Sequence, residues 1–163
     1  MDRQPIEELL RPSLQNRQFQ RPPYSVRAGF FVGFFGGLFG SVIFGALNAQ
    51  RTERLGRDAA VLGLLACVGA GVTVWIGYAT AIHDLPGFFE ALGGQKQGVR
   101  FFGRILGFLS FGLIYLLQRD MHVTRDLRGQ DAPSPWVPGI LSCVGAFVLA
   151  VAFGLLGALL AKS

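Results

Sequence analysis

A run without formal charge, from Ala28 to Gln50, restricts the fold of this chain more than any other feature. It exceeds the about 20 apolar residues with which a helix crosses a bilayer. Small residues recur at every fourth position of the run, so they would lie along one face of a helix. In lipid, such a face lets a second helix backbone come close. We therefore predict a membrane-spanning helix that packs through this first small-residue row, which consists of Gly29, Gly33, Gly37, Ser41, Gly45 and Ala49.

The composition is that of a membrane protein. Hydrophobic residues make up 51% of the chain and charged residues 15%, whereas soluble domains average about 25% charged residues. The net charge of +5 would also fit a nucleic-acid-binding protein. However, the charges cluster in short polar stretches, and arginines that flank apolar segments contact lipid phosphates and set orientation. We therefore expect the lipid bilayer, and no nucleic acid, as the partner.

The apolar segments predict an all-α, polytopic membrane protein of four transmembrane helices in two antiparallel hairpins. Residues 1–25 would form a polar N-terminal tail and residues 26–163 the transmembrane domain, with spans at about 26–48, 59–82, 101–118 and 136–161. Gly56 is expected to end the first helix and Asp58 to cap the second. A short interfacial helix is expected within residues 86–94. Arg104 interrupts the third span near one end, where its side chain can snorkel to the headgroups.

The two halves of the chain resemble each other, which suggests an internal duplication. Glycine and phenylalanine are so common here that some of the matches arise by composition alone, so chance similarity remains the alternative. The overlay aligns Gly29 and Gly33 with Gly103 and Gly107, and Arg51 and Arg54 with Arg125 and Arg128; a slightly different shift aligns residues 67–70 with residues 143–146.

Basic residues give the expected orientation, because cytoplasmic loops carry an excess of them. The side that would hold both termini has more basic residues than the side with the two helix-connecting turns. This count places both termini in the cytoplasm and the protein in the cell inner or plasma membrane. The turn arginines lie close to the membrane ends, where the rule is strongest, and they favour the reverse orientation.

The densest group of candidate functional side chains is the polar stretch 118–131. In one interpretation His122 acts as a base and three arginines bind the phosphate of a lipid headgroup. These are Arg119, Arg125 and Arg128. In the other interpretation the stretch is a solvated helix extension with ion pairs between neighbouring turns. The predicted spans contain no Asp, Glu or Lys, which argues against an ion-coupled transporter. No catalytic residue, metal site or cofactor is predicted, because no motif for one is present.

The predicted fourth span carries a second small-residue row. Its members are Ser142, Ala146, Ala150, Gly154 and Ala158. Because such faces favour helix association, the leading hypothesis is a non-enzymatic structural or accessory subunit that forms a homo-oligomer or joins a larger membrane complex. An oligomeric pore or permease-like channel is one alternative. A membrane enzyme that acts on lipid headgroups is the other.

Overall fold

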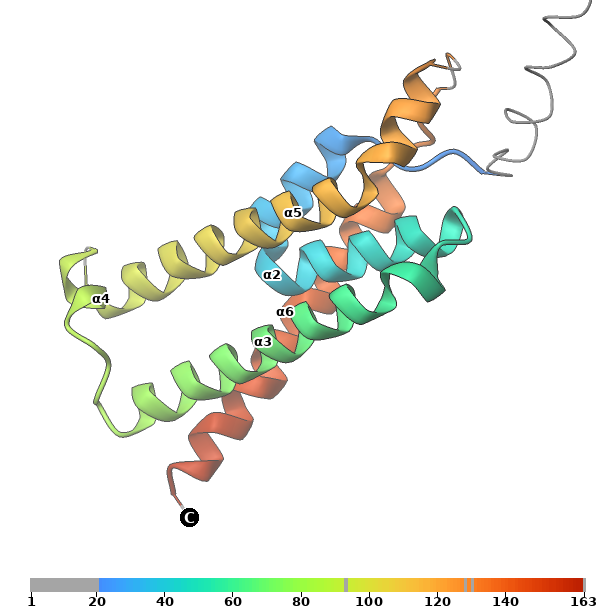
Figure 1. Ribbon diagram of the computed structural model, residues 1–163. Helices are drawn as coiled ribbons and strands as arrows, with labels where there is room; N and C mark the ends of the chain where they lie inside the picture. The colour runs from blue at the N-terminus through green and yellow to red at the C-terminus, as the bar shows by residue number, and fades with distance from the viewer. Residues whose placement is uncertain (1–20, 93, 128, 130, 163) are drawn as a thin grey trace, which may run out of the picture.

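The computed structural model describes residues 21–92, 94–127, 129 and 131–162 (Figure 1). Its helices, in chain order, are α2 (Val26–Arg51), α3 (Leu55–Ala81), α4 (Phe88–Ala91), α5 (Gln95–Leu127) and α6 (Trp136–Leu160). No strand occurs in these residues, and the all-α prediction is confirmed. Nearly all of the predicted N-terminal tail lies outside the described residues.

Four of these helices are long and apolar enough to cross a membrane, as predicted. The most apolar stretches of α2, α3 and α6 have mean hydropathies of 2.0, 2.2 and 2.5. The corresponding value for α5 is 1.5, and α5 extends beyond the predicted span at both ends because the flanking polar residues continue the helix. The short helix α4 lies within the segment expected at the interface. The protein is therefore a polytopic helical membrane protein.

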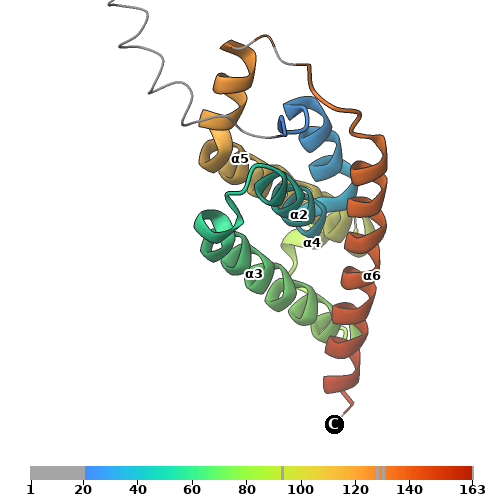
Figure 2. The same cartoon turned by 90° about the vertical axis from the view of Figure 1, so that its right-hand side faces the viewer.

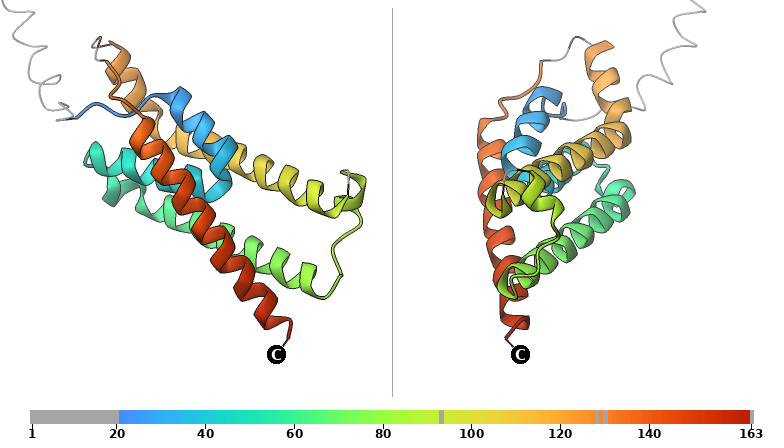
Figure 3. Two further views of the ribbon diagram at one scale, coloured as in Figure 1. Left: turned by 180° about the vertical axis from the view of Figure 1, so that it is seen from behind. Right: turned by 90° about the vertical axis from the view of Figure 1, so that its left-hand side faces the viewer.

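Helix α2 lies at the centre of the bundle, and α3, α5 and α6 surround it (Figure 2). It packs most extensively against α5 and α6, and α6 also packs along α3 (Figure 3). Among the four candidate spans, α2 has the largest share of its apolar stretch buried by protein. The other three present broad apolar faces outward, as expected for helices in contact with lipid.

The central helix is broken at Gly37, which has a φ of 60° and a ψ of −150°. This backbone conformation is essentially restricted to glycine, because a Cβ would clash with the chain. The break divides α2 into a first half, residues 26–36, and a second half, residues 38–51. The first half is about 16 Å long, which is roughly half of a hydrocarbon core of about 30 Å. In place of one continuous helix, α2 thus consists of two half-helices.

The two halves of α2 fold back on each other. The backbone N–H of Tyr24 donates to Oδ1 of Asn48 over 2.8 Å, and Nε of Arg51 donates to the carbonyl oxygen of Pro22 over 2.8 Å. The Tyr24 ring packs against Phe44, with 5.6 Å between the ring centroids. Both ends of α2 therefore lie at the same end of the bundle, and the end of α6 lies at the other (Figure 1).

Helix α5 packs against the break without an intervening side chain. A Cβ at Gly107 would overlap the carbonyl oxygen of Gly33 and the backbone of Gly37. The hydroxyl of Ser41 lies 3.2 Å from the Gly37 carbonyl oxygen and 3.1 Å from the Gly107 carbonyl oxygen. Backbone contact and a hydroxyl donor thus stabilise the irregular segment, which lipid alone would leave without partners.

Two predicted helix ends differ from the structure. α2 ends at Arg51 rather than Gly56, and Thr52 follows as its C-cap, with Oγ1 donating to the Asn48 carbonyl oxygen over 2.8 Å. Asp58 lies within the first turn of α3 and is fully buried, so it does not cap the helix.

The predicted duplication is not confirmed. The overlay equates Gly37 with Phe111, and α5 continues as an unbroken helix through that position. The first helices of the two proposed repeats therefore have different shapes.

Candidate functional site

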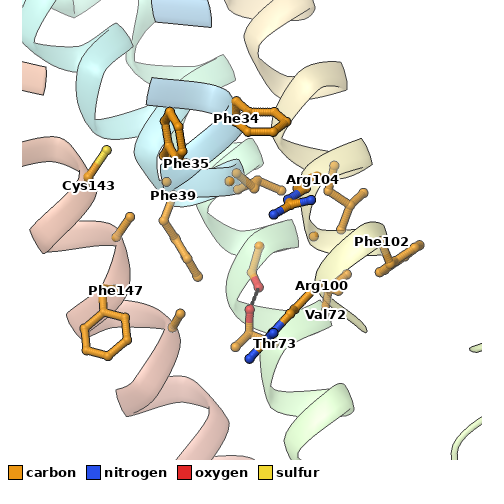
Figure 4. A pocket seen from close by; sticks show the side chains of 18 of the residues that line it. Phe34, Phe35, Phe39, Val72, Thr73, Arg100, Phe102, Arg104, Cys143 and Phe147 are labelled. Atoms are coloured by element: carbon orange, nitrogen blue, oxygen red, sulfur yellow. Dashed lines mark hydrogen bonds between the residues drawn. The ribbon is translucent and has the colours of Figure 1, made fainter. Parts of the chain in front are cut away.

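A cavity of about 380 Å³ lies beside the break, between α2, α3, α5 and α6. Residues 34–39, which include the point where α2 folds back, form one wall. The charged residues in the lining are Arg100 and Arg104, both from α5, and we call this space the basic cavity. The remaining lining is mostly apolar (Figure 4).

Arg100 and Arg104 stand one helical turn apart on the same face of α5. The guanidinium carbon of Arg104 lies 5.0 Å from the centre of the Phe34 ring, within the range of a cation–π contact. Figure 4 shows Arg104 close to the break and Arg100 beside Thr73 of α3. Within the described residues neither arginine has a carboxylate partner. Both guanidinium groups are therefore available to an anion.

Arg104 lies next to the break in α2. A Cβ at Gly37 would lie 3.5 Å from the carbonyl oxygen of Gly103, the neighbour of Arg104 in α5. The next turn of α5 carries Gly107, which touches the break. A charge within an apolar span is costly unless it faces a cavity or a partner, and it commonly marks a functional site.

The walls of the basic cavity can contact the apolar part of a ligand. Figure 4 shows Phe39 of α2 and Cys143 and Phe147 of α6 around the space. The Thr73 hydroxyl already donates to the carbonyl oxygen of Gly69, over 2.7 Å. The second half of α2 also starts here, so the positive end of its dipole adds to the positive potential.

The first small-residue row is packed inside the chain. A Cβ at Gly29 would come within 2.9 Å of the Phe111 ring, and one at Gly45 within 2.8 Å of the Ile114 side chain. Ala49 is fully buried. The middle members of the row meet Gly107 as described above. The partner of this row is therefore α5 of the same chain.

The second small-residue row is buried at its first two members and more open beyond them. Ser142 and Ala146 are 0% and 2% exposed, and Ala146 lies against α2 near the break. The backbone of Gly154 lies against Gly77 of α3, where any added Cβ would overlap it. Ala150 lines the basic cavity. These residues thus join α6 to α2 and α3.

The structure describes three of the four predicted headgroup-binding residues, all on the last turns of α5 and in different surroundings. Arg119 is exposed, whereas the His122 side chain is 6% exposed and stacks on an aromatic ring two turns earlier in α5. Arg125 forms an ion pair with Asp126, its neighbour in the sequence. Arg128 lies outside the described residues. A headgroup role for these four residues stays a prediction.

A buried polar contact connects three helices near the ends of α2. Nε2 of Gln118 donates to Oδ2 of Asp58 over 3.2 Å and to the carbonyl oxygen of Gly45 over 3.0 Å. Oδ1 of Asp58 has no hydrogen-bond partner among the residues that the structure describes. The Asp58 side chain is fully buried, and within the described residues Gln118 is the side chain that donates a hydrogen bond to its carboxyl group.

Sequence reasoning missed the basic cavity, although two signals for it are present. An arginine inside an apolar helix is a standard indication of a functional site, whereas from the sequence Arg104 is expected to reach the headgroups. The second signal is the adjacent pair Gly36 and Gly37, of which only Gly37 is included in the predicted packing face. Neither signal shows that α5 and the break in α2 lie side by side.

No group of three or more His, Cys, Asp or Glu side chains that could hold a metal ion occurs in the described part of the chain. No protein-family model, curated protein or solved structure matches this chain, so its site is interpreted from its own residues.

Proposed function

We propose that this protein is a non-enzymatic integral membrane protein that binds an acidic lipid in the basic cavity. The observation that carries the proposal is the pair of exposed arginines Arg100 and Arg104 in an otherwise largely apolar cavity between α2, α3, α5 and α6. Guanidinium groups bind phosphate through paired N–H donors. Apolar walls suit the hydrocarbon part of the same ligand.

The chemistry of the cavity favours binding over reaction. Arginine stays protonated in proteins, so Arg100 and Arg104 can donate hydrogen bonds but are unsuited to act as general bases. The Thr73 hydroxyl is held by the Gly69 carbonyl oxygen. These groups hold and orient an anion.

The small-residue rows support this proposal over assembly through helix faces. Their members pack against α2, α3 and α5 of the same chain, and Ala150 lines the basic cavity. Rows that are already occupied offer little surface to a second subunit. The apolar faces that remain outward are compatible with lipid contact.

The test is lipid binding to the full chain in detergent, measured by native mass spectrometry with phosphatidylglycerol. Arg104→Gln should weaken binding about tenfold, the loss of one charge-assisted hydrogen bond to a phosphate. Arg57→Gln is the control, because Arg57 is exposed on α3 and outside the linings of the described cavities. Equal binding by Arg104→Gln and Arg57→Gln would contradict the proposal.

Two further ligands define the chemistry of the site. Phosphatidylcholine, whose headgroup has no net charge, should bind more weakly than phosphatidylglycerol. Inorganic phosphate should compete poorly, because it leaves the apolar walls unfilled. Displacement of the lipid by inorganic phosphate at equal concentration would show a site for free phosphate and overturn the lipid proposal.

A further inference from the structure

Two apolar grooves flank the first half of α2, outside the basic cavity. The larger, which we call the α6 groove, has a volume of about 690 Å³ and lies between this half-helix and α6. The smaller, the α5 groove, has a volume of about 320 Å³ and lies where the half-helix meets Phe111 of α5. The half-helix thus separates two hollows with mainly hydrocarbon walls.

Arg27 and Phe31 line both grooves. Arg27 is exposed and is the charged residue of each lining. Phe31, which follows one turn later, is 58% exposed and stands between the two hollows. One cation therefore stands at the start of two diverging apolar surfaces.

Arg27 and the groove entrance lie where a membrane surface is expected. Arg27 lies in the first turn of α2, and Trp136, 75% exposed, begins α6 beside the same groove. Tryptophan is enriched at the level of lipid headgroups. From there the α6 groove extends along α6 to Val144, toward the middle of the helix. Charge at the surface with hydrocarbon below it is the layout of a phospholipid.

We propose that an acidic diacyl phospholipid straddles the first half of α2, with its phosphate on Arg27 and one acyl chain in each groove. Within the described residues Arg27 has no carboxylate partner. The positive end of the α2 dipole adds to the attraction for a phosphate. A lipid with a single chain would leave one of the two hollows unfilled.

This site and the basic cavity have different charged residues. The α6 groove and the basic cavity meet at Phe35 and Cys143, which line both. Their arginines differ, since Arg27 lies at the start of α2 and Arg104 lies beside the break. Two bound lipids per chain are therefore expected, and each can be removed by its own substitution.

Native mass spectrometry of the full chain with phosphatidylglycerol tests the charge. Arg27→Gln should lose one of two bound lipids, through binding about tenfold weaker at that site. Arg57→Gln is the control, because Arg57 is exposed on α3 and outside the linings of both grooves. Arg104→Gln should retain the lipid at Arg27, which separates this inference from the proposed function. Unchanged binding in Arg27→Gln would overturn it.

A pair of valines on α6 tests the grooves. Val144 lines the α6 groove and is 56% exposed, whereas Val148 is 58% exposed and lies outside it. Val144→Trp should weaken binding of phosphatidylglycerol at the Arg27 site but leave binding of its single-chain lyso form unchanged. Val148→Trp should change neither. Equal affinity of the unmodified chain for the diacyl and lyso forms at this site would overturn the two-groove arrangement.

Discussion

The backbone N–H of Tyr24, which precedes the broken helix α2, donates over 2.8 Å to Oδ1 of Asn48, which lies in the last turn of the same helix. A helix that crossed the membrane in one piece would hold these residues on opposite sides. If α3, α5 and α6 each cross the bilayer, α2 enters and leaves it on one side. Residues 21–25 and the C-terminal end of α6 then lie on opposite sides of the bilayer, whereas the orientation expected from the basic residues places them on one side.

Single cysteines test this topology in a background without Cys67 and Cys143. Arg21→Cys and Arg57→Cys should react with an impermeant maleimide from one side of the membrane, because both positions are exposed near the ends of α2. Lys162→Cys should react from the other side. Labelling of Arg21→Cys and Lys162→Cys from the same side would show that α2 crosses as a whole.

The backbone conformation of Gly37 predicts a position-specific effect of alanine. Gly37→Ala should lower the free energy of unfolding by about 1–3 kcal/mol, because a side chain is strained at this φ and ψ. Gly36→Ala should change it much less, since a Cβ there would lie 3.5 Å from Sγ of Cys143, an ordinary contact. Thermal unfolding in detergent, followed by size-exclusion chromatography, compares the two. Equal midpoints would mean that the break is not needed for the fold.

The contact of α5 with the break can be tested on one helix. Gly107→Ala should destabilise the bundle by about 1–3 kcal/mol, because its Cβ would press on the backbone of α2. Gly112→Ala is the control, since nothing lies within 4 Å of a Cβ at that position. Both midpoints can be read in the same thermal assay. A stable Gly107→Ala protein would argue against close packing of α5 on α2.

Because the Gln118 amide makes buried hydrogen bonds, its removal should lower the stability of the protein. Gln118→Leu should destabilise the protein by about 1–3 kcal/mol, because the Asp58 carboxylate and the Gly45 carbonyl would each lose a buried donor. Gln97→Leu makes the same chemical change at an exposed position of α5 and should be nearly neutral. Loss of the folded fraction can be followed by the reactivity of Cys143. Similar reactivity in both variants would contradict a structural role for Gln118.

The sequence by itself determined the fold class and most of the helix positions. Hydropathy, segment length and polar turns are local properties, so they identified four apolar helices and the short helix at Phe88–Ala91. They also predicted close packing at the glycines of α2, because a missing side chain lets a neighbouring backbone approach.

Only the tertiary structure decided the shape of α2 and the location of the basic cavity. Glycine permits both a straight helix and the conformation of Gly37, and the choice depends on distant contacts such as Ser41 with Gly107. Likewise, the apolar segment around Arg104 is compatible with an arginine that reaches the membrane surface. Its place beside the break follows from the packing of α5 on α2, which joins residues far apart in the chain and leaves no local pattern.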